Sequence, residues 1–202
     1  MRLKRLLWLQ FLLLLVFAGT ANADTVQING TYAFANNGYG IPPYGGTLNG
    51  QAQSFYCVDF SSTIAAGDIW SVAVTSLSGT NFSSTLLGNQ KSYLEMAWLV
   101  MQGMSTTDQL QQAKDQYAIW SFSGGPNPYG TNSSLVAAAL AAVNAGFAGQ
   151  GFQILTPTPG SHGQEFLIFS MPEPTVGLML VLGLIMLGVT ARRKQPAGAN
   201  AT

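Results

Sequence analysis

The sequence predicts an α+β protein with an antiparallel β-sandwich or barrel-like core and an inserted helical subdomain at about residues 89–149. Alternating hydrophobic residues mark strands before and after that range. Within it, hydrophobic residues recur with helical spacing. The order of strands, helices and strands is typical of the α+β class.

The strands before the helices are expected in three segments. In residues 25–34 and 70–74 every second residue is hydrophobic, which indicates half-buried strands. A third strand, residues 53–60, places Phe55, Cys57 and Asp59 on one face, with Tyr56, Val58 and Phe60 on the other. Residues 38–50 are rich in glycine and proline and are expected to form a loop.

Three helices are expected next. The first lies around residues 93–101, and the second begins at Thr106, whose capping box with Gln109 precedes a hydrophobic stripe ending at Trp120. The third begins near Asn132 and includes the alanine-rich residues 135–143. Strand signals return at residues 152–155 and 165–169.

The N-terminus is typical of a secretory signal peptide, residues 1–23. Basic residues precede an apolar run at 6–18, and Ala21-Asn22-Ala23 forms a small-residue cleavage site. The alternative is a retained transmembrane helix, but the run is shorter than the roughly 20 residues that span a bilayer. We therefore expect export through the inner membrane.

The C-terminus, residues 171–202, carries a second predicted targeting signal. A Pro-Glu-Pro sequence precedes an apolar segment at 175–190 and a basic cluster, and positive residues favour the cytoplasmic side of a membrane. The residues of this motif are Pro172, Glu173, Pro174, Arg192, Arg193 and Lys194. This arrangement resembles the PEP-CTERM sorting signal of bacterial surface proteins, and the alternative is an ordinary C-terminal anchor.

The PEP-CTERM resemblance implies partners and a location. In that family an exosortase, a membrane enzyme, processes the tail, often in bacteria that make exopolysaccharide. The resemblance therefore implies membrane attachment before processing, and then a place at the cell surface or in the extracellular matrix, where such proteins contribute to adhesion and biofilm.

Between the two predicted targeting signals, residues 24–170 are expected to form one acidic extracellular domain. Two lysines stand against seven acidic residues, a net charge of −5. Without a basic patch, binding to nucleic acid is not expected. No metal-ligand spacing and no phosphate loop is apparent, so no cofactor is expected.

Cys57 is the only cysteine of the chain. Exported cysteines normally pair with each other, so a single one suggests a bond to another chain, a reactive thiol or another covalent partner. The simplest alternative is a buried, inert thiol, which is what most free cysteines are.

Two segments together favour a covalent partner within the chain: Phe55 to Asp59 on a strand, and Asp115 to Trp120 at the end of a helix. They resemble the two halves of the thioester domain of bacterial surface adhesins. In that family an aromatic residue precedes the cysteine, and a Thr-Gln-x-Ala-Ile-Trp motif supplies the glutamine that is joined to it.

The thioester resemblance implies a role for each matching residue. Cys57 and Gln116 would form the thioester, and Ala118, Ile119 and Trp120 complete the second motif, whereas Asp115 stands where the family has threonine. Phe55, Tyr56, Tyr117 and Trp120 are the expected shields against water. Such a bond captures amine or hydroxyl nucleophiles on a target, matrix polysaccharide or protein, and is consumed in reacting, so no enzyme is expected.

Other classes remain open from the sequence. A cysteine hydrolase needs a base, and His162 is the only histidine. Paired acids for glycoside cleavage would come from Asp59, Asp68 and Asp115, but their spacing singles out no pair. The main rival is a structural or exopolysaccharide-associated PEP-CTERM surface protein with an inert Cys57.

Overall fold

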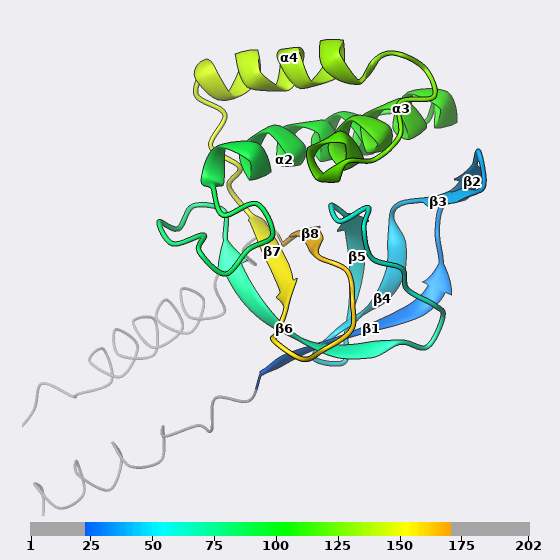
Figure 1. Cartoon of the computed structure of the whole chain (residues 1–202), viewed down its shortest axis with the longest axis vertical. Helices are drawn as coiled ribbons and strands as arrows, with labels where there is room; N and C mark the ends of the chain where they lie inside the picture. Colours follow the sequence, from blue (N-terminus) through cyan, green and yellow to red (C-terminus); the bar gives the residue numbers. More distant parts are fainter. Residues whose placement is uncertain (1–22, 171–202) are drawn as a thin grey trace, which may run out of the picture. The chain divides into compact units, whose positions relative to one another are not determined.

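Six antiparallel strands close into a barrel in a computed structural model that describes residues 23–170 of the chain (Figure 1). Around the barrel the order is β1-β4-β5-β8-β7-β6, and β6 pairs with β1 to close it. The strands are β1 Asp24–Thr31, β4 Tyr44–Leu48, β5 Gln51–Cys57, β6 Ile69–Ser76, β7 Phe152–Pro157 and β8 Phe166–Phe169. The prediction of an α+β protein with a barrel-like antiparallel core is confirmed.

Large apolar side chains fill the barrel because alternate residues of each strand point inward. Phe55 and Phe166 lie at its centre with ring centroids 5.5 Å apart, and Trp70 stacks on Phe166 at 5.8 Å. Both Phe55 and Cys57 are buried, whereas Tyr56 between them is half-buried. The predicted strand faces therefore hold as far as Cys57.

Residues 38–50 are not a loop, contrary to the composition-based prediction. They contain β3 Tyr39–Ile41, which pairs with β2 Phe34–Asn36, and all of β4. Gly46 explains why a glycine-rich segment enters the barrel: a Cβ there would lie 2.1 Å from the Gln27 carbonyl oxygen and 2.9 Å from the Phe55 ring. Glycine is needed here for close packing.

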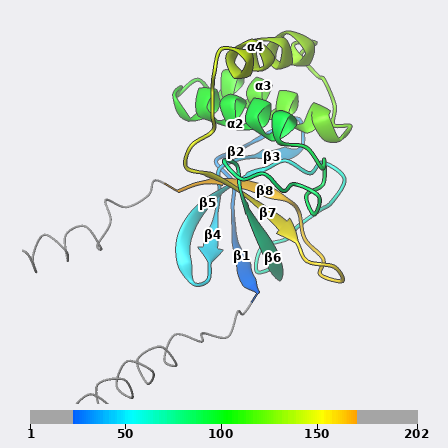
Figure 2. The same cartoon turned by 90° about the vertical axis from the view of Figure 1, so that its left-hand side faces the viewer.

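The helices follow β6 in the chain and lie across one end of the barrel (Figures 1 and 2). They are α2 Gln90–Met104, α3 Gln109–Trp120, the short 3₁₀ helix η1 Ser121–Ser123 and α4 Asn132–Asn144. Both views show α2 and α3 between α4 and the barrel. This position explains why the last six residues of α3 are all buried, whereas α4 buries only Asn132 and Ala139.

Helix α3 begins later than predicted. Its N-cap is Asp108, whose carboxylate accepts a hydrogen bond from the Leu110 N–H at 2.9 Å. The predicted cap, Thr106, instead accepts from the Asp108 N–H at 3.1 Å. Both are good capping residues, and the turn formed by Thr106 shifts the helix start by two residues.

Strand β5 ends at Cys57, three residues before the predicted end at Phe60. Beyond it the Asp59 carboxylate accepts hydrogen bonds from the Ser61 backbone N–H and hydroxyl. Such a local turn competes with the strand ladder. Asp59 is therefore not on the strand face of Cys57, contrary to the prediction.

The predicted sorting elements lie outside the described residues. These are the signal peptide and the C-terminal segment with its apolar run at 175–190 and with Pro172, Glu173, Pro174, Arg192, Arg193 and Lys194. Within residues 23–170, no helix combines the length and apolar character needed to cross a bilayer.

Replacing Gly46 with alanine is expected to destabilise the barrel. The new methyl group would overlap a backbone carbonyl that cannot rotate away, so we expect a loss of about 1–3 kcal/mol in the free energy of unfolding. Gly103→Ala is the control, since its Cβ would meet only the Asp115 carboxylate oxygen at 3.9 Å. Urea unfolding measures both, and equal midpoints for Gly46→Ala and wild type would contradict the close approach.

Candidate functional site

Cys57 is buried at the end of β5, with 1 % of its surface exposed. Its thiol lies 3.2 Å from the Asp59 carbonyl oxygen and 3.3 Å from Gln164 Oε1, and donates to these acceptors. Its own carbonyl accepts a hydrogen bond from the side chain of Gln116. The cysteine is thus surrounded by hydrogen-bonding groups although it lies in the hydrophobic core.

Gln116 lies on α3 and reaches the barrel from the helical side. Its Nε2 donates to the Cys57 carbonyl oxygen at 2.8 Å, and the residue is 3 % exposed. The structure therefore brings together the two residues that the thioester resemblance pairs, although 59 positions separate them in the chain. A glutamine carboxamide lies beside the residue that carries the thiol.

Helical spacing explains which residues of the second motif face Cys57. Gln116 and Trp120 are four positions apart and so share one face of α3. Tyr117 turns toward the β2–β3 hairpin, where its hydroxyl donates to the Asn36 carbonyl oxygen at 2.9 Å. Ala118 and Ile119 are also buried.

Aromatic rings pack in the same buried core as Cys57. Phe55 and Tyr117 are fully buried, and Trp120 is 4 % exposed. The Trp120 ring packs against Tyr117 at 5.5 Å and Phe60 at 5.4 Å between centroids. Of the four predicted shields, only Tyr56 is half-buried.

Burial raises the pKa of the Cys57 thiol to about 12. The Trp120 indole N–H and the Asp59 backbone lower this pKa in part, and the charges of Asp59 and Glu165 raise it further. The Trp120 N–H makes no hydrogen bond within ordinary geometric limits, so its effect is that of a nearby dipole. The charge of Asp59 thus opposes thiolate formation, but burial is the main cause of the raised pKa of Cys57.

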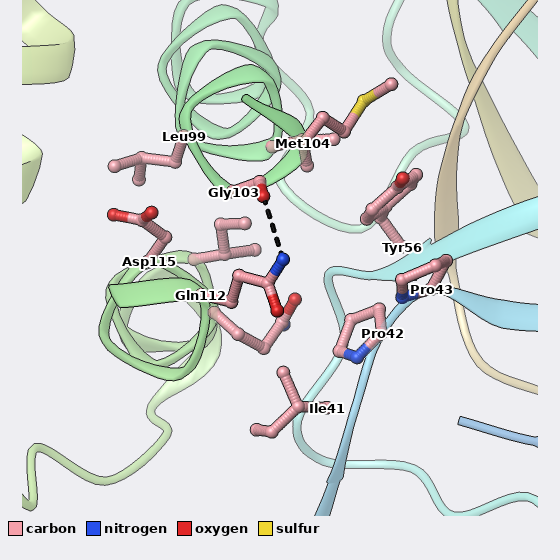
Figure 3. A pocket seen from close by; sticks show the side chains of 12 residues that line it. Ile41, Pro42, Pro43, Tyr56, Leu99, Gly103, Met104, Gln112 and Asp115 are labelled. Atoms are coloured by element: carbon pink, nitrogen blue, oxygen red, sulfur yellow. Dashed lines mark hydrogen bonds between the residues drawn. The ribbon is translucent and has the colours of Figure 1, made fainter. Parts of the chain in front are cut away.

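A pocket of about 290 Å³ reaches Gln116 from outside (Figure 3). One wall is apolar and comes from the barrel side, another is the last two turns of α2, and the third is α3. Its lining residues are Ile41, Pro42, Pro43, Tyr56, Leu99, Val100, Gly103, Met104, Gln112, Asp115, Gln116 and Ile119. Gln116 is thus the member of the pair that lines this pocket, and Cys57 is not among its lining residues.

Asp115 lines the same pocket and is 2 % exposed. Its Oδ1 accepts a hydrogen bond from Gln111 Nε2 at 2.9 Å, while its Oδ2 has no partner. Burial raises the pKa of Asp115 to about 6, and the bond from Gln111 lowers it in part. Asp115 is not among the groups that shift the pKa of the Cys57 thiol.

The structure offers little to the other chemical classes. His162 is exposed and is not a hydrogen-bond partner of Cys57. Asp59 and Asp68 are both engaged in local turns, with Asp68 accepting from the Ala65 N–H at 2.6 Å. In residues 23–170, no group of three or more His, Cys, Asp or Glu side chains is arranged to hold a metal ion.

Sequence reasoning missed Gln164. It lies in the loop before β8, is 8 % exposed, and its Nε2 donates to the Ser62 carbonyl oxygen. Two glutamines therefore flank Cys57, one at its thiol and one at its carbonyl. No motif surrounds Gln164 in the sequence, so only the fold could reveal it.

Comparisons of the chain with protein-family models, curated proteins and solved structures gave no match.

The raised pKa of Asp115 predicts a specific pH dependence of stability. The folded state holds this proton up to about pH 6, whereas the unfolded chain releases it near 3.8. Unfolding free energy therefore falls as pH rises between these values. Asp115→Asn should be the more stable protein above pH 6, by about 2 kcal/mol, and should lose the advantage near pH 4.

A second variant tests the cause of this pH dependence. Gln111→Ala removes the hydrogen bond that lowers the pKa of Asp115, so the fall in stability should shift to higher pH. Chemical unfolding from pH 4 to pH 8 measures all three proteins. Parallel stability curves for wild type and Asp115→Asn would show that Asp115 titrates as it does in the unfolded chain.

Proposed function

We propose that this chain is an exported surface or matrix protein that binds its target covalently through an internal thioester between Cys57 and Gln116. The observation that carries this proposal is the contact between Gln116 Nε2 and the Cys57 carbonyl oxygen, 2.8 Å, in a buried site. The acyl group would react with an amine or hydroxyl nucleophile. The protein is consumed in the reaction and is not an enzyme.

Formation of the bond needs only the two side chains. The Cys57 sulfur attacks the carboxamide carbon of Gln116, the C–N bond breaks, and the nitrogen leaves as ammonia with the proton of the thiol. A raised thiol pKa makes the free thiolate rare, so attack and proton transfer to the leaving nitrogen must be coupled. Burial slows this step but equally slows later hydrolysis.

The surroundings support a long-lived acyl group. Phe55, Tyr117 and Trp120 keep solvent from the sulfur side, because all three are almost fully buried. The pocket that Gln116 lines would give a nucleophile a route to its acyl group. Exclusion of water with a defined entrance is what a capture reaction requires.

The predicted signal peptide and PEP-CTERM-like tail supply the location in this proposal. An exosortase-type enzyme would process the tail after export, when the membrane segment has held the protein at the envelope. The folded domain would then present its pocket to amines or hydroxyls of matrix protein or polysaccharide. Its acidic character and its two lysines leave few internal amines to compete.

The alternative is a structural or exopolysaccharide-associated surface protein with an inert thiol. One observation favours it: the Cys57 thiol is fully buried and its pKa is raised to about 12, as in an unreactive core cysteine. The two functions differ in covalent structure, so mass measurement separates them.

The thioester predicts a purified protein that is lighter than its sequence by one molecule of ammonia. Incubation with methylamine should add the mass of methylamine and free the Cys57 thiol for alkylation after denaturation. Intact-mass spectrometry with peptide mapping measures both changes. An unshifted mass together with immediate alkylation of denatured protein would leave the inert surface protein as the function.

Two glutamine variants assign the acyl partner. Gln116→Ala should restore the full sequence mass, because it removes the carboxamide that donates to the Cys57 carbonyl oxygen. Gln164→Ala is the matched control: it removes a carboxamide at hydrogen-bond distance from the thiol and should still lose ammonia. The reverse pattern would assign the bond to Gln164.

A further inference from the structure

Asp115 and Gln116 are consecutive residues of α3, and both line the pocket. Figure 3 shows Asp115 and Gln112 on one helix, with Leu99 and Gly103 across from them on the other. A carboxylate and the side chain of Gln116 therefore border the same pocket.

One oxygen of that carboxylate is free to bind. Oδ1 is occupied by Gln111, but Oδ2 is buried without a hydrogen-bond partner. Opposite Oδ2 stands Gly103, where a Cβ would lie 3.9 Å from this oxygen and within 4 Å of no other atom outside its own helix and chain neighbours. The glycine thus leaves open the space that a donor to Oδ2 would occupy. A buried, unpartnered carboxylate oxygen is unfavourable, and a cation would relieve it.

No cation of the described residues takes this place. Lys114 lies over the Tyr129 ring, 6.0 Å from its centroid, and the charge of Lys91 lowers the pKa of Glu95 in part. The other ionisable side chain that lines the pocket is Tyr56, whose pKa is raised by burial, so it is neutral.

The remaining elements around α3 bring no positive charge to Asp115 either. Helix α4 carries no ionisable side chain, and the Tyr93 hydroxyl of α2 donates a hydrogen bond to the Glu165 carboxylate. With a pKa of about 6, Asp115 is negatively charged at neutral pH. The pocket therefore favours a positively charged ligand.

We propose that Asp115 binds the ammonium form of a primary alkylamine in this pocket and removes its proton, so that the amine attacks the acyl carbon of Gln116. This step rests on the thioester proposed above. Asp115 then acts as a catalytic base, and as the group that selects amines over neutral hydroxyls.

The step balances with the groups present. The ammonium gives one proton to Asp115 and attacks as a free amine, forming the C–N bond of an amide. The C–S bond breaks, the nitrogen loses its second proton to the Cys57 sulfur, and the products are amide and thiol. Asp115 later releases its proton to solvent.

The apolar pocket walls define the amine further. Ile41, Pro42 and Met104 suit the methylene chain of an alkylamine, with the ammonium at Asp115. A lysine side chain or a free aliphatic amine has this form. A sugar hydroxyl has neither the charge nor the apolar arm.

The test compares a charged with an uncharged nucleophile. Methylamine is an ammonium at neutral pH, whereas hydroxylamine is largely uncharged. The rate of adduct formation, followed by intact mass from pH 5 to pH 9, should show an Asp115→Asn defect of about 100-fold with methylamine and little defect with hydroxylamine. In wild type the preference for methylamine should decline below about pH 6.

Glu95→Gln is the matched control, because it also neutralises a buried carboxylate among the helices but one that does not line the pocket. It should keep the wild-type ratio of the two rates. An unchanged ratio in Asp115→Asn would overturn the role of Asp115 and leave the thioester standing. Absence of ammonia loss in the wild type, seen before any nucleophile is added, would overturn both.

A second measurement covers the case in which Asp115→Asn forms no thioester, because such a variant has no reaction rate to measure. The Cys57→Ser background then decides the question without the reaction. n-Butylammonium should raise the melting temperature of Cys57→Ser in a concentration-dependent way and leave that of Cys57→Ser with Asp115→Asn unchanged. Equal shifts in the two proteins would overturn the binding role.

Discussion

The hydrogen bond from Gln116 to the Cys57 carbonyl joins the helices to the barrel at a point where strand pairing ends. The backbone after β5 is buried and must find other partners. Ser123 supplies two of them, as its hydroxyl donates to the Val58 carbonyl at 3.0 Å and accepts from the Phe60 N–H at 3.0 Å. The end of α3 and η1 thus supply hydrogen-bond partners to residues 57–60, which ties α3 to the barrel.

This junction places stability and reactivity in competition. The nitrogen that Gln116 donates to Cys57 is the atom that leaves as ammonia when a thioester forms, so the bond that aligns the pair is lost in the reaction. The proposed cross-link would instead close a loop of about 58 residues, which on chain entropy would stabilise the fold by about 4 kcal/mol. A nucleophile that opens the thioester removes this cross-link without restoring the original carboxamide.

The sequence predicted the elements whose signals are local. Helical spacing located α3, and its i, i+4 geometry puts Gln116 and Trp120 on the face toward Cys57. Composition failed at residues 38–50, because Gly46 serves a close approach to Gln27 and Phe55 rather than a turn. The role of Gln164 could not be predicted for a different reason. Its contact with Cys57 spans 107 positions, and its sequence neighbours form no recognisable motif.

The effects of charged groups near Cys57 and Gln116 could be predicted only in part from the sequence. The sequence placed Asp59 on the predicted strand face of Cys57, but the dominant influence on the pKa of the Cys57 thiol is burial, which depends on the whole fold. Asp115 stands where the resembled family has threonine, one residue before Gln116. In the structure its carboxylate lies near Gln111 and Gly103, because one residue along a helix turns a side chain by about 100°, and it still lines the pocket that Gln116 lines. A substitution that looked like a defect of the motif becomes a feature of the pocket.

Barrel closure also determines how copies of this protein behave when crowded together. Each of the six barrel strands has a hydrogen-bonded neighbour on both sides, so none offers a row of unpaired amides to a sheet of another copy. Within residues 23–170, the two-stranded β2–β3 sheet is the exception, and its strands are three residues long. Such short edges are poor templates for strand addition, so this fold can be packed densely on a surface with little tendency to aggregate through its sheets.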